Sequence, residues 1–320
     1  MKKNLVLLAL ATIVMPVSAA EQFPTRPIRV IVPYAPGGNV DISARIIAPP
    51  LGEALGQTIV VDNRPGAGGN LGASLVAKAT PDGYTLLVGS SGPLSVNPVI
   101  FKNLPYDTLK DFAPISTVQA VSLVVLAGPK SNFNSIADVI TAAKARPGKL
   151  TMASAGAGTT NHFAIELFAH MANVKLLHVP YKGSGPALSE LLGGQVETMI
   201  DQLAASIGYV RDGRLKVLAV TTQQRAAALP TVPTLEELGY KGYQASTLLG
   251  LLAPAGTPKP VIAKLNAGVR KIMDSPVVAE RFRGLGANPG ASSPEEFTAR
   301  IRDELEQWRS LVKQLNLKFE

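Results

Sequence analysis

Four short segments combine glycine with hydroxyl and amide side chains, the groups that hold small polar molecules. They read YAPGGNVDIS (34–43), VGSSGPLSVN (88–97), ASAGAGTTNH (153–162) and MIDQLAAS (199–206). Each follows or ends an apolar run typical of a buried strand, and open α/β sheets bind ligands at the carboxyl ends of their strands. None of the four contains Lys or Arg. A carboxylate bound among them would rest on amide N–H groups, hydroxyls and waters.

The segment 153–162 has the clearest anion-binding pattern. Its two glycines free the backbone, and the residues after them offer a cap and exposed donors at a predicted helix start. Unpaired N–H groups and the helix dipole together favour an anion there. The residues concerned are Gly156, Gly158, Thr159, Thr160 and Asn161.

The glycine pair of the first segment, Gly37 and Gly38, precedes another predicted helix start. For both glycine pairs, a plain strand-to-helix turn is the alternative interpretation. Two acids complicate an anion site, because Asp41 and Asp201 would repel an anion at close range unless a water, hydroxyl or amine intervenes. Asp41 lies in the first helical turn, where it either faces the ligand or only complements the helix dipole. Asp201 follows a short apolar strand, and we predict that it faces the cleft as an acceptor.

Enzyme signatures are not met. GSSGP (89–93) has Pro where a nucleophile elbow needs its second Gly. GAGTTN (156–161) lacks the third glycine of a dinucleotide fingerprint, and the chain has no Gly-Lys-Ser/Thr phosphate loop. His162 and His170 lie two turns apart on one predicted helix, with no carboxylate at ligand spacing. We therefore predict no catalytic residue, no metal and no cofactor, and a protein that is not an enzyme; whether His162 approaches the cleft stays open.

Short apolar runs that alternate with amphipathic stretches must position these segments. The predicted strands are 28–32, 58–62, 84–89, 122–128, 150–154, 175–179, 197–200 and 216–220. Strands that are apolar throughout and separated by helices predict mainly parallel sheets covered on both faces. Ser135 and Ser293 begin helices with N-cap patterns, and Trp308 falls on the apolar stripe of the last helix. Pro49-Pro50 predicts a break near Ala48 in the first helix.

The N-terminus and the composition indicate an exported protein. Lys2 and Lys3 precede an apolar run that ends in small residues, which is the layout of a signal peptide cleaved after Ala20. The chain has no cysteine, so disulfides, thiol nucleophiles and a lipid-anchored N-terminus are excluded. Its formal charge of +8 comes from scattered Lys and Arg with few aromatics, which argues against nucleic-acid binding. We expect a monomer in the bacterial periplasm.

Two extended runs, 119–128 and 243–256, are candidates for crossings between two domains. We predict that residues 1–20 form the signal peptide, that 21–122 and 249–320 form a discontinuous first domain, and that 123–248 form the second.

Several long strings resemble one known group of proteins, the periplasmic solute-binding receptors of the tripartite tricarboxylate transporter family, or Bug proteins. They include FPTRPIRVIVPYAPGGNVD (23–41), LGQTIVVDNRPGAGGNLGA (55–73), KARPGKLTMASAGAGTTNH (144–162) and VPYKGSGPALSELLGGQVE (179–197). The similarity extends over essentially the whole chain after residue 20. It implies a type II periplasmic binding-protein fold, in which two α/β domains joined by two crossover segments close on one ligand.

The resemblance also implies which residues hold the ligand carboxylate, partly through waters. From the first domain it points to Tyr34, Ala35, Gly37, Gly38 and Asn39, with Ser90 and Ser91 as further donors. From the second domain it points to Ser154, Ala155, Gly158, Thr159, Thr160 and Asn161, with Asp201 opposite. The implied function is capture of a small organic carboxylate for the membrane components of a secondary transporter.

Two questions stay open at this point. The same receptor could instead present its ligand to a membrane sensor kinase. The acid itself could be a di- or tricarboxylate, an acidic amino acid or an aromatic acid. Many relatives place an aromatic residue before GLLAPAG (250–256), where this chain has Thr247-Leu248-Leu249, so ligand identity is not carried over from them.

Overall fold

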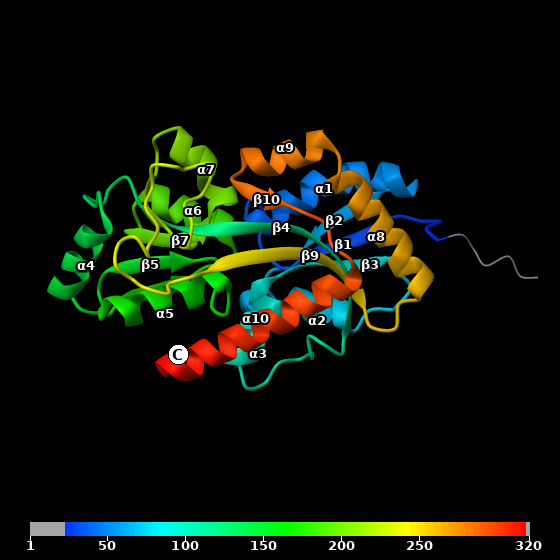
Figure 1. Cartoon of the computed structure of the whole chain (residues 1–320), viewed down its shortest axis with the longest axis horizontal. Helices are drawn as coiled ribbons and strands as arrows, with labels where there is room; N and C mark the ends of the chain where they lie inside the picture. The colour runs from blue at the N-terminus through cyan, green and yellow to red at the C-terminus, as the bar shows by residue number, and fades with distance from the viewer. Residues whose placement is uncertain (1–22, 318–320) are drawn as a thin grey trace, which may run out of the picture.

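The structure is a computed structural model that describes residues 23–317. The predicted signal peptide lies outside the described residues. One curled mixed sheet runs through the molecule in the strand order β2-β1-β3-β9-β4-β7-β5-β6, with β8 and β10 also paired to β4. We call the part that contains β1, β2, β3, β9 and β10 the first lobe, and the part that contains β5, β6, β7 and β8 the second lobe (Figure 1).

The strands of the first lobe are β1 (Ile28–Val32), β2 (Ile59–Asn63), β3 (Thr85–Ser90), β9 (Ser246–Pro254) and β10 (Ala287–Pro289). The strands of the second lobe are β5 (Thr151–Ser154), β6 (Leu177–Pro180), β7 (Thr198–Gln202) and β8 (Lys216–Val220). The long strand β4 (Phe112–Ala127) belongs to both lobes.

Helices cover both faces of each lobe. Those of the first lobe are α1 (Asn39–Leu55), α2 (Asn70–Ala77), α3 (Asn97–Ile100), α8 (Lys259–Met273), α9 (Pro276–Gly284) and α10 (Pro294–Leu315), with the short turns η1 (Ala67–Gly69) and η2 (Gly92–Val96). Those of the second lobe are α4 (Ile136–Ala145), α5 (Thr160–Ala172), α6 (Ser184–Gly193) and α7 (Leu203–Arg211).

Strand β4 carries the sheet from one lobe to the other. Its residues 112–122 pair with β9, and its residues 123–127 pair with β7 and β8. The chain returns to the sheet of the first lobe at Ser246, which pairs with Ser122. The pairing of β1 with β2 and β3, and of β5 with β6 and β7, is parallel as predicted. The long strands β4 and β9 pair antiparallel with each other because the chain passes in opposite directions through the two crossings.

The strands that bring the candidate segments together are buried on both faces. Residues 198–202 of β7 are all buried, as are five of the six residues of β3. A large apolar cluster extends from Val30 and Val88 in the first lobe to Ala153 and Met199 in the second. Burial of this apolar area is the dominant stabilising contribution, so the loops at the strand ends are held on a rigid base.

Both predicted N-caps are present as capping boxes. The Ser135 Oγ accepts a hydrogen bond from the Asp138 N–H at 3.2 Å, and the Asp138 carboxylate accepts the Ser135 N–H at 2.9 Å. Ser293 and Glu296 make the same reciprocal pair at 3.1 and 2.8 Å. These bonds satisfy donors that would otherwise lack a partner at the helix start.

The predicted break near Ala48 is wrong, because α1 continues through Pro49 and Pro50 to Leu55. Pro49 is exposed and Pro50 is half-buried. The carbonyls that lose an N–H partner to these prolines are those of Arg45 and Ile46, which are themselves exposed and half-buried. Water can satisfy such carbonyls, so the helix need not end there.

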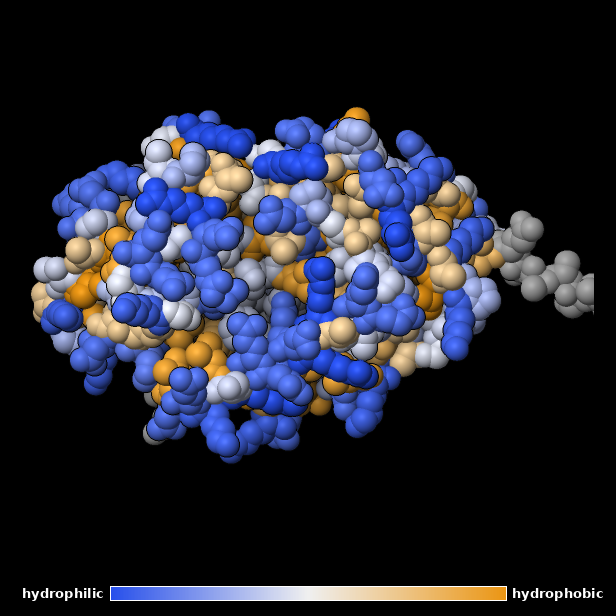
Figure 2. Space-filling model, in the orientation of Figure 1, coloured by the Kyte–Doolittle hydropathy of each residue, from blue (hydrophilic) through white to orange (hydrophobic). Residues whose placement is uncertain are grey.

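The last helix spans both lobes. Helix α10 packs on β4 and η2 of the first lobe, and Figure 1 shows its C-terminal end beneath α5. There Trp308, buried as predicted, contacts Phe163 of α5 with ring centroids 4.6 Å apart. Hydrophilic residues cover most of the face in Figure 2, with apolar residues between them in small groups. Within residues 23–317, no helix is long and apolar enough to cross a membrane.

Candidate ligand-binding site

A closed cavity lies between the two lobes at the carboxyl ends of β1, β3, β5 and β7. Ten residues line it: Tyr34, Gly38, Asn39, Val40 and Ser90 from the first lobe, and Ala155, Thr159, Thr160, Ser184 and Gln202 from the second. The lobes close over it so far that the centre of a water molecule has only about 10 Å³ to occupy. This volume corresponds to about one water, so a larger ligand needs the lobes to move apart.

Three helices begin at this cavity. Helix α1 starts after Gly38 and helix α6 after Gly183, and neither start has a side-chain cap. Helix α5 starts after Thr159, whose Oγ1 accepts the His162 N–H. The N–H groups of the first turns have no acceptor within their own helix. Their positive partial charges converge on one space, which favours an anion.

Among residues 23–317 no cationic side chain lines the cavity, and none of the four segments contains Lys or Arg. Asn39 supplies a further donor, because its buried Nδ2 has no hydrogen-bond partner among the described residues. The Asn39 side chain is oriented by Gln119 of β4, whose Nε2 donates to Asn39 Oδ1 at 2.8 Å and to Ser43 Oγ at 2.6 Å. A buried unpaired amide beside a cavity is costly unless a ligand or water accepts from it.

On the second lobe, Asp201 lies directly behind the lining residue Ser184. The Ser184 Oγ donates to Asp201 Oδ1 at 2.6 Å, and Asn161 Nδ2 donates to the same oxygen at 3.0 Å. Asp201 is fully buried. This burial raises the pKa of Asp201 to about 7, against the lowering effect of the Ser184, Gln202 and Asn161 hydrogen bonds. Near neutral pH only about half of the acid is therefore ionised, which reduces its repulsion of an anion.

Tyr34 is the aromatic residue of the cavity wall. Its hydroxyl donates to the Gly68 carbonyl and lies 3.2 Å from Ser90 Oγ. Burial raises the pKa of Tyr34 to about 12, despite the opposing effect of the Ser90 hydrogen bond. The phenol therefore stays neutral, and Tyr34 and Ser90 together add hydroxyl groups to the wall.

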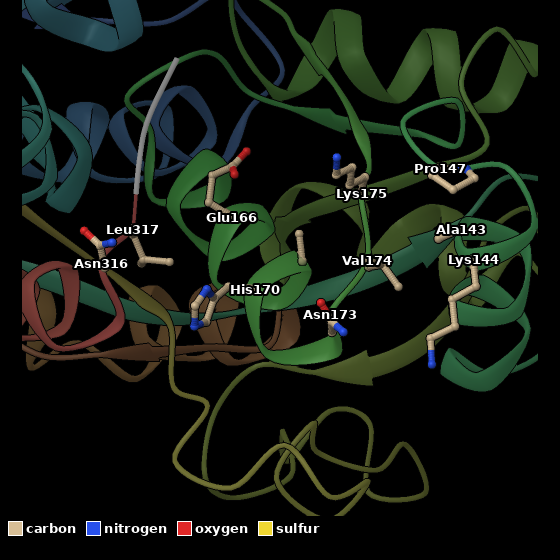
Figure 3. A pocket seen from close by; sticks show the side chains of 11 residues that line it. Ala143, Lys144, Pro147, Glu166, His170, Asn173, Val174, Lys175, Asn316 and Leu317 are labelled. Carbon is tan, nitrogen blue, oxygen red and sulfur yellow. The ribbon is translucent and has the colours of Figure 1, made fainter.

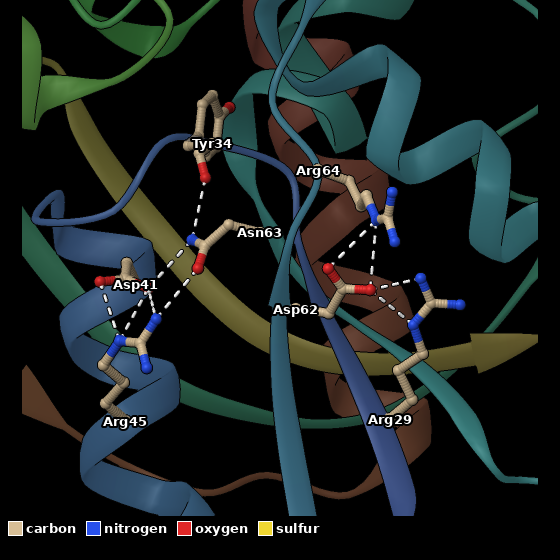
Figure 4. A network of polar contacts seen from close by, with 7 residues as sticks. All are labelled: Arg29, Tyr34, Asp41, Arg45, Asp62, Asn63 and Arg64. Carbon is tan, nitrogen blue, oxygen red and sulfur yellow. Dashed lines mark hydrogen bonds and ion pairs between the residues drawn. The ribbon is translucent and has the colours of Figure 1, made fainter.

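The Asp41 carboxylate is hydrogen-bonded to neighbouring protein groups and does not line the cavity (Figure 4). Its carboxylate accepts hydrogen bonds from the Gly37 N–H at 3.0 Å, from Arg45 Nε at 3.0 Å and from Asn63 Nδ2 at 2.9 Å. Partial burial would raise the pKa of Asp41, but the hydrogen bonds from Arg45, Gly37 and Asn63 outweigh it and hold the pKa below its usual range. Of the two alternatives, this geometry favours a carboxylate that fastens the start of α1.

Seven of the residues that the sequence predicted line the cavity: Tyr34, Gly38, Asn39, Ser90, Ala155, Thr159 and Thr160. The other eight lie next to it and contact protein groups instead. They are Ala35, Gly37, Asp41, Ser91, Ser154, Gly158, Asn161 and Asp201. Ser91, for example, donates from its Oγ to Glu304 of α10 at 3.1 Å and accepts the Leu248 N–H. The direct ligand contacts of these eight remain predictions.

Val40, Ser184 and Gln202 line the cavity but were not predicted. Gln202 falls within the segment 199–206, directly after Asp201. Ser184 falls within VPYKGSGPAL (179–188). The signal for Ser184 was the pair Gly183 and Gly185. A Cβ on Gly185 would lie 2.3 Å from the Pro36 carbonyl oxygen, so glycine is required where α6 begins against the loop of the first lobe.

A histidine cluster lies on the outer side of the loop 154–159. His162, Glu166 and His178 place one potential ligand atom each within 4.8 Å of one another. The expectation that no carboxylate accompanies the histidines is therefore wrong, because Glu166 lies one turn after His162 and β6 brings in His178. The two imidazole rings, however, stack with centroids 4.2 Å apart and planes 10° apart. In this arrangement their in-plane lone pairs do not converge on one ion, so the geometry assigns no metal.

A larger hollow lies elsewhere, between the ends of α4 and α5 and the C-terminal end of α10 (Figure 3). It is a surface groove of about 820 Å³, lined by residues that include Lys144, His170, Lys175 and Leu317. Its polar side chains do not converge, and no long helix begins in it. The smaller cavity between the lobes has the features of a ligand site.

The fold and the cavity define a two-lobed α/β solute-binding protein. Residues 43–317 match the family model described as "Tripartite tricarboxylate transporter family receptor", and the chain belongs to this family. The protein BugT of Bordetella pertussis is 39% identical over 98% of this chain and 96% of its own length. Proteins of this family are periplasmic.

Solved structures share the fold over nearly the whole chain. The periplasmic binding protein BugD superposes with a TM-score of 0.89 at 36% identity, covering 93% of this chain and all of that one. Rpa4515 of R. palustris with adipate gives a TM-score of 0.89 at 36% identity, covering 92% and 99% of the two chains. MatC of Rhodopseudomonas palustris with bound malate gives a TM-score of 0.88 at 34% identity, covering 91% of this chain and 100% of that one.

Proposed function

We propose that this protein captures a small organic carboxylate in the cavity between the lobes and delivers it to the membrane components of a tripartite tricarboxylate-type transporter. The observation that carries the proposal is the convergence of the starts of α1, α5 and α6 on a cavity without Lys or Arg. Such a site binds anions through neutral donors. The adipate and malate bound to two similar proteins support a dicarboxylate as the first class to test.

Capture requires the lobes to open and close, because the closed cavity is far too small for such an acid. One contact between the lobes in the closed form is a backbone hydrogen bond. The Ala35 N–H of the first lobe donates to the Lys182 carbonyl of the second at 2.9 Å. We propose that the lobes correspond to the predicted domains 21–122 with 249–320 and 123–248, and that they move about the crossings in β4 and before β9.

The binding proposal is tested with protein from which bound ligand has been removed by unfolding and refolding. Malate, adipate, citrate, glutamate and benzoate are compared with neutral solutes of similar size by thermal shift and calorimetry. Because a ligand that binds the native state stabilises it by mass action, we expect at least one acid to raise the melting temperature and to be recovered unchanged. Stabilisation by the neutral solutes alone would contradict an anion site.

Gly38→Val is the matching variant. Gly38 has an ordinary φ of −88°, and a Cβ there would lie 3.4 Å from Ser184 Cβ in the closed form. The larger valine side chain would block closure and cover the α1 amides, so we expect acid binding to be lost with the fold intact. Gly208→Val is the control, since a Cβ at Gly208 of α7 meets nothing within 4 Å. Unchanged affinity in Gly38→Val would refute the site.

Delivery is a separate step with its own test. We propose that residues 1–20 direct export and that the mature protein meets its transporter in the periplasm. Binding to membrane vesicles that contain the transporter, dependent on the acid, is the expected result. Binding to a membrane sensor kinase in place of the transporter would show a sensory role for the same cavity.

A further inference from the structure

We propose that His162 and His178 are positioning residues, which hold the loop 154–159 so that its free amides face the ligand cavity. This inference rests on the proposed function. The loop contains Gly156 at φ 141° and Gly158 at φ 82°, both in the region that favours glycine. Such a loop has high conformational freedom unless its polar groups are tied down.

The two imidazoles make hydrogen bonds to the loop from its outer side. His162 Nδ1 accepts the Gly158 N–H at 3.2 Å. His178 Nε2 lies 2.7 Å from Ser154 Oγ, and that same Oγ accepts the Gly156 N–H at 3.1 Å. One ring therefore fixes the end of the loop that leads into α5, and the other fixes its beginning.

Two of the amides that the histidines leave free belong to residues that line the cavity. Neither the Ala155 N–H nor the Thr160 N–H has an acceptor among the hydrogen bonds of the described residues, and both residues line the cavity. The Gly156 and Gly158 amides thus donate to the histidine-held groups, while the Ala155 amide of the loop and the Thr160 amide just after it are free at the cavity. A loop that lost the outer ties could rotate its inner amides away from an anion.

Stacking holds the two rings in place against each other. Their centroids lie 4.2 Å apart and the planes are 10° from parallel, with His162 on α5 and His178 on the edge strand β6. Glu166 also lies close, with its Oε1 3.6 Å from His162 Nε2. The pair is therefore built into the scaffold of the second lobe, outside the cavity, and acts on the ligand only through the loop.

Two substitutions at His162 separate this role from packing. In His162→Asn, the amide Oδ1 can occupy the place of Nδ1 and still accept the Gly158 N–H. In His162→Phe, a ring remains to stack on His178 but the acceptor is gone. We expect His162→Phe to weaken binding of the best acid of the panel by about ten-fold or more, and His162→Asn to stay within about three-fold of wild type.

A parallel pair at His178 tests the other end of the loop. His178→Gln retains a polar atom near the position of Nε2 for Ser154, whereas His178→Phe does not. The same order of affinities is expected. Equal affinity in wild type, His162→Phe and His178→Phe would overturn the inference, as would equal loss in the Asn and Phe variants.

A second measurement does not depend on the ligand. Hydrogen exchange of the Gly158 amide is followed by NMR in the ligand-free protein at constant pH. We expect slow exchange in wild type and His162→Asn and at least ten-fold faster exchange in His162→Phe. Exchange that is equally fast in all three would overturn the inference. Failure of every acid to bind wild type would instead refute the proposed function, while the exchange result would still decide the role of His162.

Discussion

At the scale of single residues, the buried acid Asp201 lies beside the proposed anion site. Asp201 is one residue from the lining residue Gln202 and is hydrogen-bonded to the lining residue Ser184. Full burial raises its pKa to about 7, so that the neutral form predominates in mildly acidic solution. The second oxygen, Oδ2, has no partner among the described residues. Asp201 is therefore a buried acid whose charge state depends on pH near neutrality.

Asp201→Asn tests the effect of that charge on binding. Above about pH 7 the wild-type carboxylate ionises and repels a bound anion, whereas the asparagine stays neutral. We expect the variant to bind the acid several-fold more tightly than wild type at about pH 8, with the difference vanishing at about pH 5.5. Calorimetry at both pH values measures the ratio of the wild-type to the variant dissociation constant. Titration of the ligand itself affects both constants equally and cancels in this ratio. A ratio independent of pH would contradict this assignment.

The same substitution has a predicted effect on stability. The folded-state pKa of Asp201 is raised above its value in the unfolded chain. The contribution of Asp201 to the free energy of unfolding is therefore fully present below about pH 4 and is lost as the pH rises through about 7. We expect Asp201→Asn to increase the free energy of unfolding at about pH 8 by about 1–3 kcal/mol relative to wild type. Denaturant unfolding at several pH values provides the measurement.

At the scale of elements, the start of α1 depends on the Asp41 carboxylate, which is not among the residues that line the cavity. Asp41 ties the Gly37 N–H to Asn63 of β2 and to Arg45 one turn later (Figure 4). Gly38 at the N-cap offers no side-chain cap, so Asp41 is what fixes the turn that aims the α1 amides at the cavity. The negative charge also suits the positive end of the helix dipole.

Asp41→Ala removes all three hydrogen bonds, while Arg45→Ala removes only the partly exposed cation. Because the Gly37 amide then loses its acceptor and Asn63 Nδ2 loses one of its two acceptors, we expect Asp41→Ala to lower the free energy of unfolding by about 2 kcal/mol. Arg45→Ala should cost less than about 1 kcal/mol, as exposed ion pairs do. Denaturant unfolding of both variants decides this. Similar losses of stability in the two variants would mean that the Asp41–Arg45 ion pair stabilises α1, and not the hydrogen bond from the Gly37 N–H to Asp41.

At the scale of the whole molecule, α10 connects the lobes in addition to the two crossings of the sheet. It begins on the first lobe, and in its C-terminal half Trp308 packs against Phe163 of α5, one residue after His162. If the lobes part as proposed, we expect the Trp308–Phe163 contact to slide or separate. Helix α10 thereby couples the relative position of the lobes to the environment of one aromatic ring.

Trp308 is the only tryptophan of the chain, so its fluorescence reports this contact alone. We expect the bound acid to shift its emission to shorter wavelength and to reduce quenching by acrylamide, because the ring becomes more buried as the lobes close. The Gly38→Val variant, which cannot close, should show the ligand-free spectrum at any acid concentration. An identical spectrum with and without saturating acid in wild type would contradict the movement.

Local sequence determined most of the elements and the kind of donor at the site. Apolar runs predicted β1 and β8 without error, and hydrogen-bonding residues three apart predicted the caps of α4 and α10, because these features depend on neighbours in the chain. The glycine-rich, uncharged strand ends predicted an anion held by amides. Tertiary structure decided the rest. It extended α1 past Pro49-Pro50, turned Asp41 toward Arg45, and brought Ser184 and Gln202 to the cavity. Only packing fixes which side chains face a shared space, and the same packing raises the pKa of Asp201 and stacks His162 on His178, residues that lie far apart in the sequence.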